Sequence, residues 1–381
     1  MKIEKLIPGG DGLSHIKGKA VLIPYVIPGE TVSVKTINIK KEYVKAEPVH
    51  ILKPSSFRKK PECDYFTFCG GCSWMHMNYS EQLQQKVAVF QEAMQRTGKI
   101  ELPHPDIVSG NSLRYRNRVQ FQADSHGNLG FMRRGSNTII TVNACPVLHK
   151  SLESLIDPKN TQLEKWYKNS CFTGQKKIPA YASSTWVAHP GSPDPLGSSG
   201  DLWEDILGKH IFFNLDCFFQ SNSKLLPEFV RYAVEGQKGV IAMDLYCGVG
   251  LFGAFLGEHF DQLIAVEQNK TAVKYARKNL KSSNCRIFNE KVENLDSNSF
   301  KGPVQLILVN PPRTGLTKAA RKFILQLAPD NMTYISCHPV TLARDLRGFM
   351  DSGYQVTDFR LFDFFPQTAY VESIVKMKRK S

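Results

Sequence analysis

The stretch DLYCGVGLFG, residues 244–253, follows an apolar run and precedes a helical pattern. Gly248, Gly250 and Gly253 allow the backbone of this strand-to-helix turn to approach a ligand closely, and the first N–H groups of the helix remain free to bind it. Glu267 ends the next predicted strand, at the separation where a carboxylate accepts hydrogen bonds from ribose hydroxyls. This spacing predicts a site for a cofactor that contains a nucleoside.

The pattern around this turn predicts an α/β fold with a doubly wound parallel sheet. From about Leu215 onward, apolar strands alternate with helical segments. The chain ends in YQVTDFRLFDFF and AYVESIVKMKR, which are two predicted strands with no helix between them. A terminal hairpin on a parallel sheet favours a class I methyltransferase (Rossmann-like) architecture over a dinucleotide dehydrogenase, the alternative that a glycine pattern alone leaves open.

The segment NPPRTGL, which begins at Asn310, supports the same choice. It lies at the end of the fourth predicted strand, where a ligand binds at the switch point of such a sheet. Methyltransferases carry an Asn/Asp-Pro-Pro signature at this place, and dehydrogenases have no use for it. Two adjacent prolines that simply end a strand are the alternative interpretation.

Residues 1–54 read as short strands separated by Gly and Pro turns, which predicts a small OB-like β-barrel. Lysines along it are available for phosphate, so RNA binding is the functional interpretation and a structural appendage is the alternative. The whole chain has a formal net charge of +14 and a pI near 9.3, which indicates a polyanionic partner, with an unspecialised basic surface as an equally open alternative.

No stretch has the roughly 18 apolar residues of a membrane span, and the N-terminus lacks a signal-peptide core. We therefore expect a cytoplasmic protein that does not bind membranes, acts as a monomer and needs no obligate protein partner. In a reducing compartment, nine cysteines are unsuited to disulfides, and their close spacing indicates metal binding or catalysis.

Four cysteines form a predicted metal site. Cys63, Cys69 and Cys72 follow a C-x5-C-G-G-C pattern, and Cys145 precedes a proline further along the chain. Four thiolates can hold an iron–sulfur cluster or a zinc ion. The five-residue spacing favours a [4Fe–4S] cluster that staples the loops of an RNA-binding domain, and structural zinc is the alternative.

Taken together, the motifs resemble one family. They are C-x5-CGGC with a later Cys, FFQSN, DLYCGVGLFG, NPPR, SCHP and FPQTAYVE. In this order they are similar to the RNA uracil-5-methyltransferases, which make 5-methyluridine with S-adenosylmethionine. Residues 1–54 resemble the TRAM domain that accompanies the ribosomal-RNA members and some transfer-RNA members. The resemblance therefore implies a methyltransferase that acts on RNA, with 23S ribosomal RNA favoured and transfer RNA possible.

The resemblance also implies roles for particular residues. Cys337 in SCHP would be the nucleophile that adds to uracil C6, and Glu372 in AYVES the base that removes the C5 proton. The implied contacts to S-adenosylmethionine are Gln220, Tyr246, Glu267 and Asn310, in addition to the glycines Gly248 and Gly250. A buried structural cysteine is the alternative for Cys337.

Two positions depart from the family pattern. Asn310 stands where the family usually has Asp, which removes a negative charge, although an amide oxygen still accepts a hydrogen bond. His338 stands where Asn is common, next to the nucleophile, and we expect it to change a contact to the uracil edge. Arg344 lies near Cys337 in the sequence and is the residue expected to lower its pKa.

The target base must be flipped out of its helix or loop to react. Phe218, Phe219, Phe365 and Tyr370 are candidates for stacking on bases, with core packing as the alternative. The arginines that could follow the phosphates, with a solvated face as the alternative, are Arg114, Arg116, Arg118, Arg133 and Arg134.

We expect three parts: a barrel over residues 1–54, a β-rich central domain with the metal site over 55–214, and the class I domain over 215–381. The helical pattern at residues 80–96 is expected to be able to pack back on the catalytic domain. The expected activity is methylation of C5 of one uridine. A non-catalytic RNA-binding protein, inactivated by Asn310, is an alternative from another class.

Overall fold

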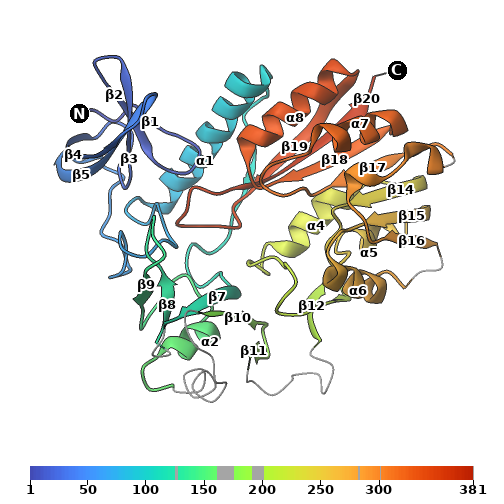
Figure 1. The fold of residues 1–381 in the computed structure, drawn as a ribbon, viewed down its shortest axis with the longest axis horizontal. Coiled ribbons are helices and arrows are strands. Elements are labelled where there is room, and N and C mark those ends of the chain that lie inside the picture. Colours follow the sequence, from blue (N-terminus) through green and yellow to red (C-terminus); the bar gives the residue numbers. More distant parts are fainter. Residues whose placement is uncertain (125–127, 161–175, 191–200, 282–283, 301, 381) are drawn as a thin grey trace.

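The computed structural model describes residues 1–124, 128–160, 176–190, 201–281, 284–300 and 302–380 (Figure 1). Within them the strands form four sheets. The N-terminal strands build a separate small sheet, and the C-terminal half of the chain builds the largest one, with helices on both faces (Figure 1).

The first sheet is a five-stranded barrel with the order β1-β2-β3-β5-β4. Its strands are β1 (Lys5–Leu6), β2 (Gly12–Ile16), β3 (Lys19–Ile23), β4 (Thr31–Ile39) and β5 (Tyr43–Lys53). Strands β3 and β5 are parallel, and a bridge between Lys2 and Thr31 brings the two edges together. This is the strand order of an OB-type barrel. Aliphatic side chains such as Ile23 and Val32 fill its interior.

The second sheet is antiparallel and has the order β11-β10-β7-β8-β9. Its elements are β7 (Arg118–Ala123), β8 (Leu129–Met132), β9 (Ile139–Thr141), β10 (Lys176–Ala182) and β11 (Val187–Ala188), with helices α2 (Lys150–Glu153) and η2 (Ser154–Ile156) packed on it. The cysteine-bearing loop is attached to this sheet through its backbone. Cys69 forms an isolated antiparallel β-bridge with Arg133, and the N–H of Gly70 donates to the carbonyl of Met132.

The largest sheet has the order β16-β15-β14-β17-β18-β20-β19-β6. The strands are β14 (Gly239–Leu245), β15 (Phe260–Val266), β16 (Cys285–Phe288), β17 (Leu306–Val309), β18 (Asn331–Ser336), β19 (Tyr354–Phe362), β20 (Glu372–Arg379) and β6 (Ile107–Val108). Strands β14 to β18 are parallel, and β20 inserts antiparallel between β18 and β19. The predicted class I methyltransferase fold with a terminal hairpin is confirmed.

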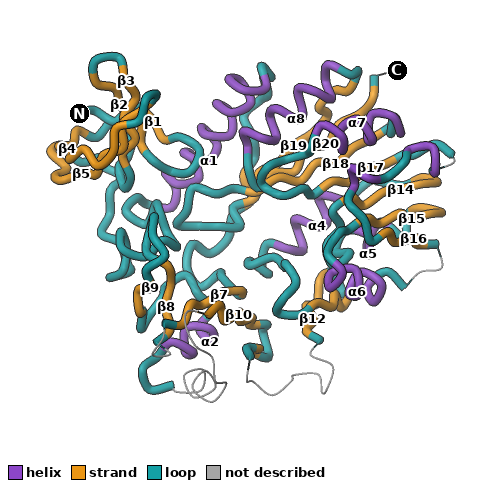
Figure 2. The backbone as a smooth tube through the Cα atoms, viewed as in Figure 1, coloured by secondary structure: helices purple, strands orange, loops and turns teal. Residues whose placement is uncertain are grey.

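Helices cover both faces of this sheet (Figure 2). They are α1 (Tyr79–Ala93), η1 (Met94–Gly98), α4 (Leu226–Val234), α5 (Gly253–Leu256), α6 (Lys270–Asn279), η3 (Val292–Asn294), η4 (Ser297–Ser299), α7 (Lys318–Leu327) and α8 (Pro339–Asp351). Helices α4, α5 and α6 pack on one face, and α1, α7 and α8 on the other. Successive residues of a strand point to opposite faces of the sheet and so pack into different cores. In β14, Ala242 packs in the core on one face and Met243 in the core on the other. In the described ranges, no helix is long and apolar enough to cross a membrane.

Two segments that precede residue 215 pack with the catalytic sheet. Helix α1 contributes Val87 and Phe90 to its core, and Phe90 stacks on Phe359 of β19 with ring centroids 6.0 Å apart. Strand β6 extends the sheet beyond β19. The hairpin of β12 (Leu202–Ile206) and β13 (Lys209–Phe213) is tied to α6, where the side-chain amide of Asn279 bonds both backbone groups of Phe212. Segments before residue 215 therefore pack with the catalytic sheet, although the sequence predicts that the class I domain begins at residue 215.

Candidate active site

The candidate active site is a cavity of about 420 Å³ at the carboxyl edge of the parallel strands. The strands β14, β15, β17 and β18 end at this edge, and the antiparallel β20 begins there. Seven of the eight residues that the sequence predicts for catalysis and cofactor binding line the cavity: Gln220, Tyr246, Gly248, Glu267, Asn310, Cys337 and Glu372. Gly250 is the exception. A Cβ there would lie 3.0 Å from the Leu280 side chain, so this glycine allows the turn to pack closely against α6.

The glycine turn and Glu267 hold each other in place. Gly248 has a positive φ of +56°, which glycine adopts without strain, and a Cβ there would meet open space. Its N–H donates to one Glu267 carboxylate oxygen at 3.1 Å, and the N–H of Asn269 donates to the other at 2.7 Å. The carboxylate is thereby fixed at the mouth of the turn, where ribose hydroxyls can donate to its remaining lone pairs.

Polar atoms that lack partners lie close to this turn. Gln220 is buried and lines the cavity, yet its side-chain oxygen has no hydrogen-bond partner. Asp244, buried at the end of β14, accepts from the N–H of Gly253 with one oxygen, and its other oxygen has no partner. Burial raises the pKa of Asp244 to about 7. Buried polar atoms normally find partners, so the unpaired oxygen of Gln220 fits a cavity that a polar ligand completes.

Cys337 follows β18 directly and reaches the cavity from the strand end. Burial raises the pKa of its thiol to about 11, the charge of Glu372 acts in the same direction, and Arg313 acts against both. Arg313 follows the neighbouring strand β17 and its guanidinium stacks over the Tyr370 ring at 4.3 Å. Arg313 is therefore the cation that lowers the pKa of the Cys337 thiol against the effect of burial, and the sequence analysis missed it although it belongs to NPPR.

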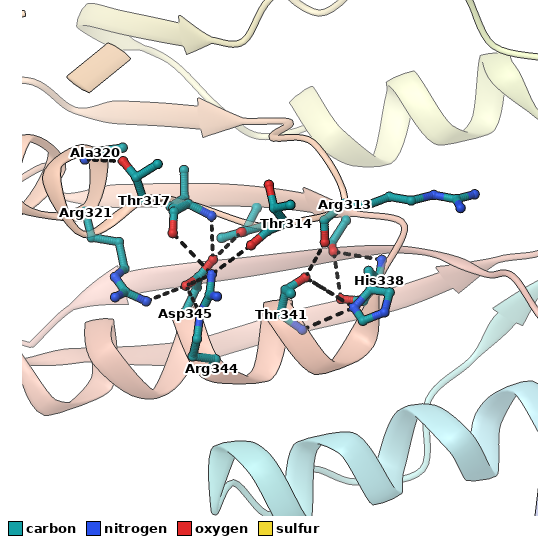
Figure 3. A network of polar contacts seen from close by, with 12 residues as sticks. Arg313, Thr314, Thr317, Ala320, Arg321, His338, Thr341, Arg344 and Asp345 are labelled. Carbon is teal, nitrogen blue, oxygen red and sulfur yellow. Dashed lines mark hydrogen bonds and ion pairs between the residues drawn. The ribbon is translucent and has the colours of Figure 1, made fainter. Parts of the chain in front are cut away.

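The expectation that Arg344 activates Cys337 is wrong. Arg344 donates to the buried carboxylate of Asp345 at 2.9 Å and to the carbonyls of Thr314 and Leu316. Figure 3 shows Arg344 and Arg321 converging on Asp345, while Arg313 extends away from this network. Asp345 thus anchors the loop after NPP and fixes the position from which Arg313 reaches the cavity.

His338 caps helix α8 and does not line the cavity. Its Nδ1 accepts from the N–H of Thr341 at 3.4 Å, and the Thr341 hydroxyl donates to the carbonyl of Arg313 (Figure 3). The expected contact between His338 and the uracil edge is therefore not supported by its position, because the imidazole serves as the helix cap.

Glu372 is the first residue of β20 and is buried beside Cys337. Burial raises the pKa of its carboxyl to about 7, and Arg313 partly offsets this effect. A carboxyl group with such a pKa exchanges protons near neutral pH, which suits a general base.

The loop that leads to Glu372 is clamped by helix α1. Lys86 and Asp363, both fully buried, form an ion pair of 2.5 Å, and Lys86 also donates to the carbonyl of Phe365. Gln82 and Gln367 exchange two hydrogen bonds of 2.8 and 2.9 Å. Gln367 has a positive φ of +67°, a strained conformation that the surrounding hydrogen bonds must maintain.

The chain that follows Cys72 holds the same loop from the other side. The backbone N–H groups of Ser73 and Trp74 both donate to the carbonyl of Gln367, at 3.0 and 2.9 Å. The N–H of Ala369 donates to the hydroxyl of Ser73 at 3.2 Å. The cysteine-bearing loop is thereby connected directly to the loop that positions Glu372.

The four aromatic candidates have different surroundings. Phe218 is 74% exposed and lines the cavity, and Phe365 also lines it. Tyr370 lies under Arg313 at the same edge. Phe219 is buried and stacks on Phe213 with ring centroids 4.1 Å apart, so much of its ring surface is used in the core although its edge reaches the cavity.

The five candidate arginines also divide. Arg118 donates to the carbonyls of Leu215 and Cys217, Arg114 pairs with Glu153, and Arg134 pairs with Asp11 at 2.5 Å. Arg116 donates to the carbonyl of Arg118 and lines the cysteine cavity. Arg133, like Arg116, has no ion pair among the described residues, and it lines a cavity beside the barrel, so it remains a candidate for a phosphate contact.

The four predicted metal ligands line one cavity of about 150 Å³. The structure thus brings Cys145 to Cys63, Cys69 and Cys72 from a distant part of the sequence. Burial and the other thiols raise the pKa of Cys72, and the N–H of Gly71 donates to the sulfur of Cys69 at 3.4 Å. In the part of the chain that is described, no group of three or more ligand side chains is close enough to hold a metal ion as it stands. Four thiols around one cavity are the donor set that a thiolate-bound group would need.

Comparison with known proteins matches two family models. The model "tRNA (Uracil-5-)-methyltransferase" matches residues 283–380, and the model "Methyltransferase small domain" matches residues 220–331. A protein described as "Uncharacterized RNA methyltransferase" from Aquifex aeolicus is 31% identical, over 100% of this chain and 98% of that protein.

Two further relatives carry specific names. Each is described as "23S rRNA (uracil(1939)-C(5))-methyltransferase RlmD", from Photorhabdus laumondii (26% identical, over 97% of this chain and 94% of that protein) and from Shewanella amazonensis (28%, over 98% and 94%). Among solved structures, the Pyrococcus abyssi tRNA (uracil-54, C5)-methyltransferase in complex with S-adenosyl-L-homocysteine superposes with a TM-score of 0.75 at 22% identity, covering 99% of both chains. This last likeness supports the fold.

Proposed function

Since the chain belongs to the RNA uracil-5-methyltransferase family, we propose that it methylates C5 of one uridine in large-subunit ribosomal RNA, with S-adenosylmethionine as the methyl donor. The full-length relatives named as 23S rRNA methyltransferases support this substrate. The observation that carries the chemistry is the convergence of Cys337, Arg313 and Glu372 on one cavity. The solved neighbour is named as a transfer-RNA enzyme, so transfer RNA is the second candidate.

The reaction needs a nucleophile because uracil C5 is a poor carbon nucleophile by itself. The Cys337 thiolate adds to C6, and the electron pair moves to C5 and O4 as an enolate. S-adenosylmethionine supplies the electrophilic methyl group that C5 takes. Glu372 then removes the C5 proton, the electron pair of that bond re-forms the C5–C6 double bond, and the C6–S bond breaks to release the thiolate.

The charges at the site match these steps. Arg313 lowers the pKa of the Cys337 thiol and so favours the thiolate before the addition and after the elimination, against burial and the charge of Glu372, which hold this pKa at about 11. Glu372 must be ionised when the C5 proton leaves, and its pKa of about 7 allows this at neutral pH. Asn310 lines the cavity and offers an amide oxygen where the family usually has a carboxylate. Because the nucleophile and the base do not depend on Asn310, we propose that the enzyme is active.

The residues at the glycine-turn side of the cavity fit S-adenosylmethionine. Glu267 would accept from the ribose hydroxyls, and the free side-chain oxygen of Gln220 would accept from a donor of the cofactor. Tyr246, with its positive φ of +59°, turns the chain at the end of β14 so that Gly248 faces the same space.

We further propose that the four cysteines hold a [4Fe–4S] cluster and that residues 1–54 are a TRAM domain that grips RNA. The five-residue spacing between Cys63 and Cys69 supports a cluster over structural zinc, and the shared cavity brings the four thiols to one place. Cluster binding would stabilise the loop that holds Gln367, so its role is structural.

The test is incubation of the metal-replete protein with labelled S-adenosylmethionine and separated ribosomal and transfer RNA, followed by nucleoside analysis. Label in 5-methyluridine of the ribosomal fraction, lost in Cys337→Ala, is expected. Label in transfer RNA alone would support the second candidate. RNA binding without label in either fraction would support a non-catalytic RNA-binding protein.

A further inference from the structure

A second cavity, of about 440 Å³, lies where the barrel meets the cysteine-bearing segment, and we call it the junction pocket. It shares no residue with the catalytic cavity. Strand β5 forms one wall and the loop between β5 and α1 forms another. Its volume lies within the roughly 300–1,000 Å³ that small-ligand sites occupy.

Three aromatic rings form the interior of the junction pocket. Tyr25 and Phe66 meet edge to face with centroids 5.1 Å apart, and His76 lies 5.7 Å from Phe66. Burial and the nearby charge of Arg58 lower the pKa of His76 to about 4, so its ring is neutral. Neither ring nitrogen has a hydrogen-bond partner of normal geometry among the described residues, although the backbone of Val26 lies beside the ring.

The backbone of the junction pocket is strained at two residues that touch each other. Tyr25 has a φ of +61° and Thr67 has a φ of +76°, and the hydroxyl of Tyr25 donates to the carbonyl of Thr67 at 3.2 Å. Thr67 is β-branched, so a positive φ is costly for it. Such strain persists where the surrounding structure maintains it and is concentrated at binding sites.

The rim provides an exposed ring and a free cation. Phe68 is 54% exposed, and its carbonyl accepts from the N–H of Arg134, which fixes the turn beside Arg133. Arg58 is neutralised by Glu30 through hydrogen bonds of 2.6 and 2.7 Å. Arg133 lines the pocket and has no ion-pair partner within the described ranges.

We propose that the junction pocket binds one unpaired nucleobase of the RNA substrate, with Phe68 stacking on the base and Arg133 bound to its phosphate. This inference rests on the proposed function for the identity of the ligand. The aromatic lining and the neutral imidazole suit an uncharged heterocycle. Arg133, which has no ion pair in the described part of the chain, suits one phosphate, although the Glu47 carboxylate also lines the pocket. The enzyme would thus hold its RNA at two nucleotides, one at Cys337 and one between the barrel and the cysteine loop.

Binding of a fluorescent single-stranded oligouridylate of about 12 nucleotides, within the site size of OB-type folds, tests this proposal by anisotropy. Phe68→Ala should weaken binding by roughly 5- to 150-fold, the loss typical of one stacked base, and Phe68→Trp should restore it. Arg133→Ala should weaken binding and reduce its salt dependence by about one phosphate contact.

The matched controls are Phe57→Ala, which removes an exposed ring outside the pocket, and Arg277→Ala, which removes an exposed cation of α6. Both should bind as the wild type does. Photocrosslinking of a 4-thiouridine oligonucleotide should label peptides that contain Tyr25 or Phe68, in wild type and in Cys337→Ala alike. Unchanged binding by Phe68→Ala, or crosslinks confined to the catalytic cavity, would overturn the proposal. The methylation assay does not depend on the junction pocket. A failure of the proposed function would therefore appear as absent methylation, and a failure of this proposal as unchanged binding by Phe68→Ala.

Discussion

The substitution Lys86→Met removes the charge that pairs with Asp363 inside the protein. Both side chains of this pair are completely buried, and their atoms lie 2.5 Å apart. Methionine has nearly the same length and adds no new polar group, so the variant tests the ion pair with little change in packing. Asp363 would keep its bonds to the hydroxyl of Tyr79 and the N–H of Phe365 but would lose its counter-ion.

The expected cost is about 3–5 kcal/mol of the free energy of unfolding, the usual loss when one partner of a buried pair is removed. The surface pair of Lys59 and Glu62, with side chains 31% and 45% exposed, supplies the control. Lys59→Met should cost no more than about 1 kcal/mol. The double variant Lys86→Met/Asp363→Asn should recover part of the loss, because it no longer buries an uncompensated charge.

Urea unfolding gives these free energies, and single-turnover methylation measured where the variant remains folded gives the effect on the reaction. The loop that carries Phe365 and Gln367 leads directly into Glu372, so the rate of the chemical step should fall more than RNA affinity does. A loss of less than about 1 kcal/mol in Lys86→Met, with an unchanged single-turnover rate, would refute the clamp described for this loop.

Three other predictions follow from the site. The ionised form of Glu372 is the base and its pKa is about 7, while the pKa of the Cys337 thiol is about 11, so the methylation rate should rise with pH and fall more steeply below about pH 7, in an acidic limb that Glu372 adds to the slope set by the thiol; an unchanged slope near pH 7 would exclude this role. Arg313 lowers the pKa of both Cys337 and Glu372, so Arg313→Gln should slow the reaction and move this acidic limb to higher pH, with partial recovery in Arg313→Lys; an unmoved limb would contradict its role. Cys72→Ser should remove iron and sulfide from the purified protein and lower its melting temperature, whereas the control Cys285→Ser should keep the iron and the sulfide. Undiminished metal content in Cys72→Ser would argue against the cluster.

The fold could be predicted because its strands carry a strong pattern. Strands β14 and β17 are buried on both faces and read as continuous apolar runs, as parallel strands do. Strand β6 has only two residues and no pattern of its own, so its place at the end of the sheet depends on tertiary contacts with β19. The packing of β12 and β13 on α6 likewise has no local signal.

The candidate site was predictable to the extent that strand ends locate it. Residues that directly follow parallel strands meet at one edge, which is why Glu267, Asn310 and Cys337 line the same cavity. Arg344 misled the prediction because proximity in sequence is not proximity in space. It lies roughly 8 Å along α8 from the first helical residue, at 1.5 Å per residue, whereas Arg313 leaves the adjacent strand at the same edge.

The most direct test of the central claim is to trap the bond between Cys337 and uracil. RNA with fluorine at C5 of uracil has no C5 proton for Glu372 to remove, so the C6–S bond should persist once methylation has occurred. We expect wild type, S-adenosylmethionine and this RNA to give a complex that survives denaturing electrophoresis, and Cys337→Ala to give none. A persistent complex in Cys337→Ala, or none in a wild-type protein that methylates ordinary RNA, would contradict the assignment of Cys337 as the nucleophile.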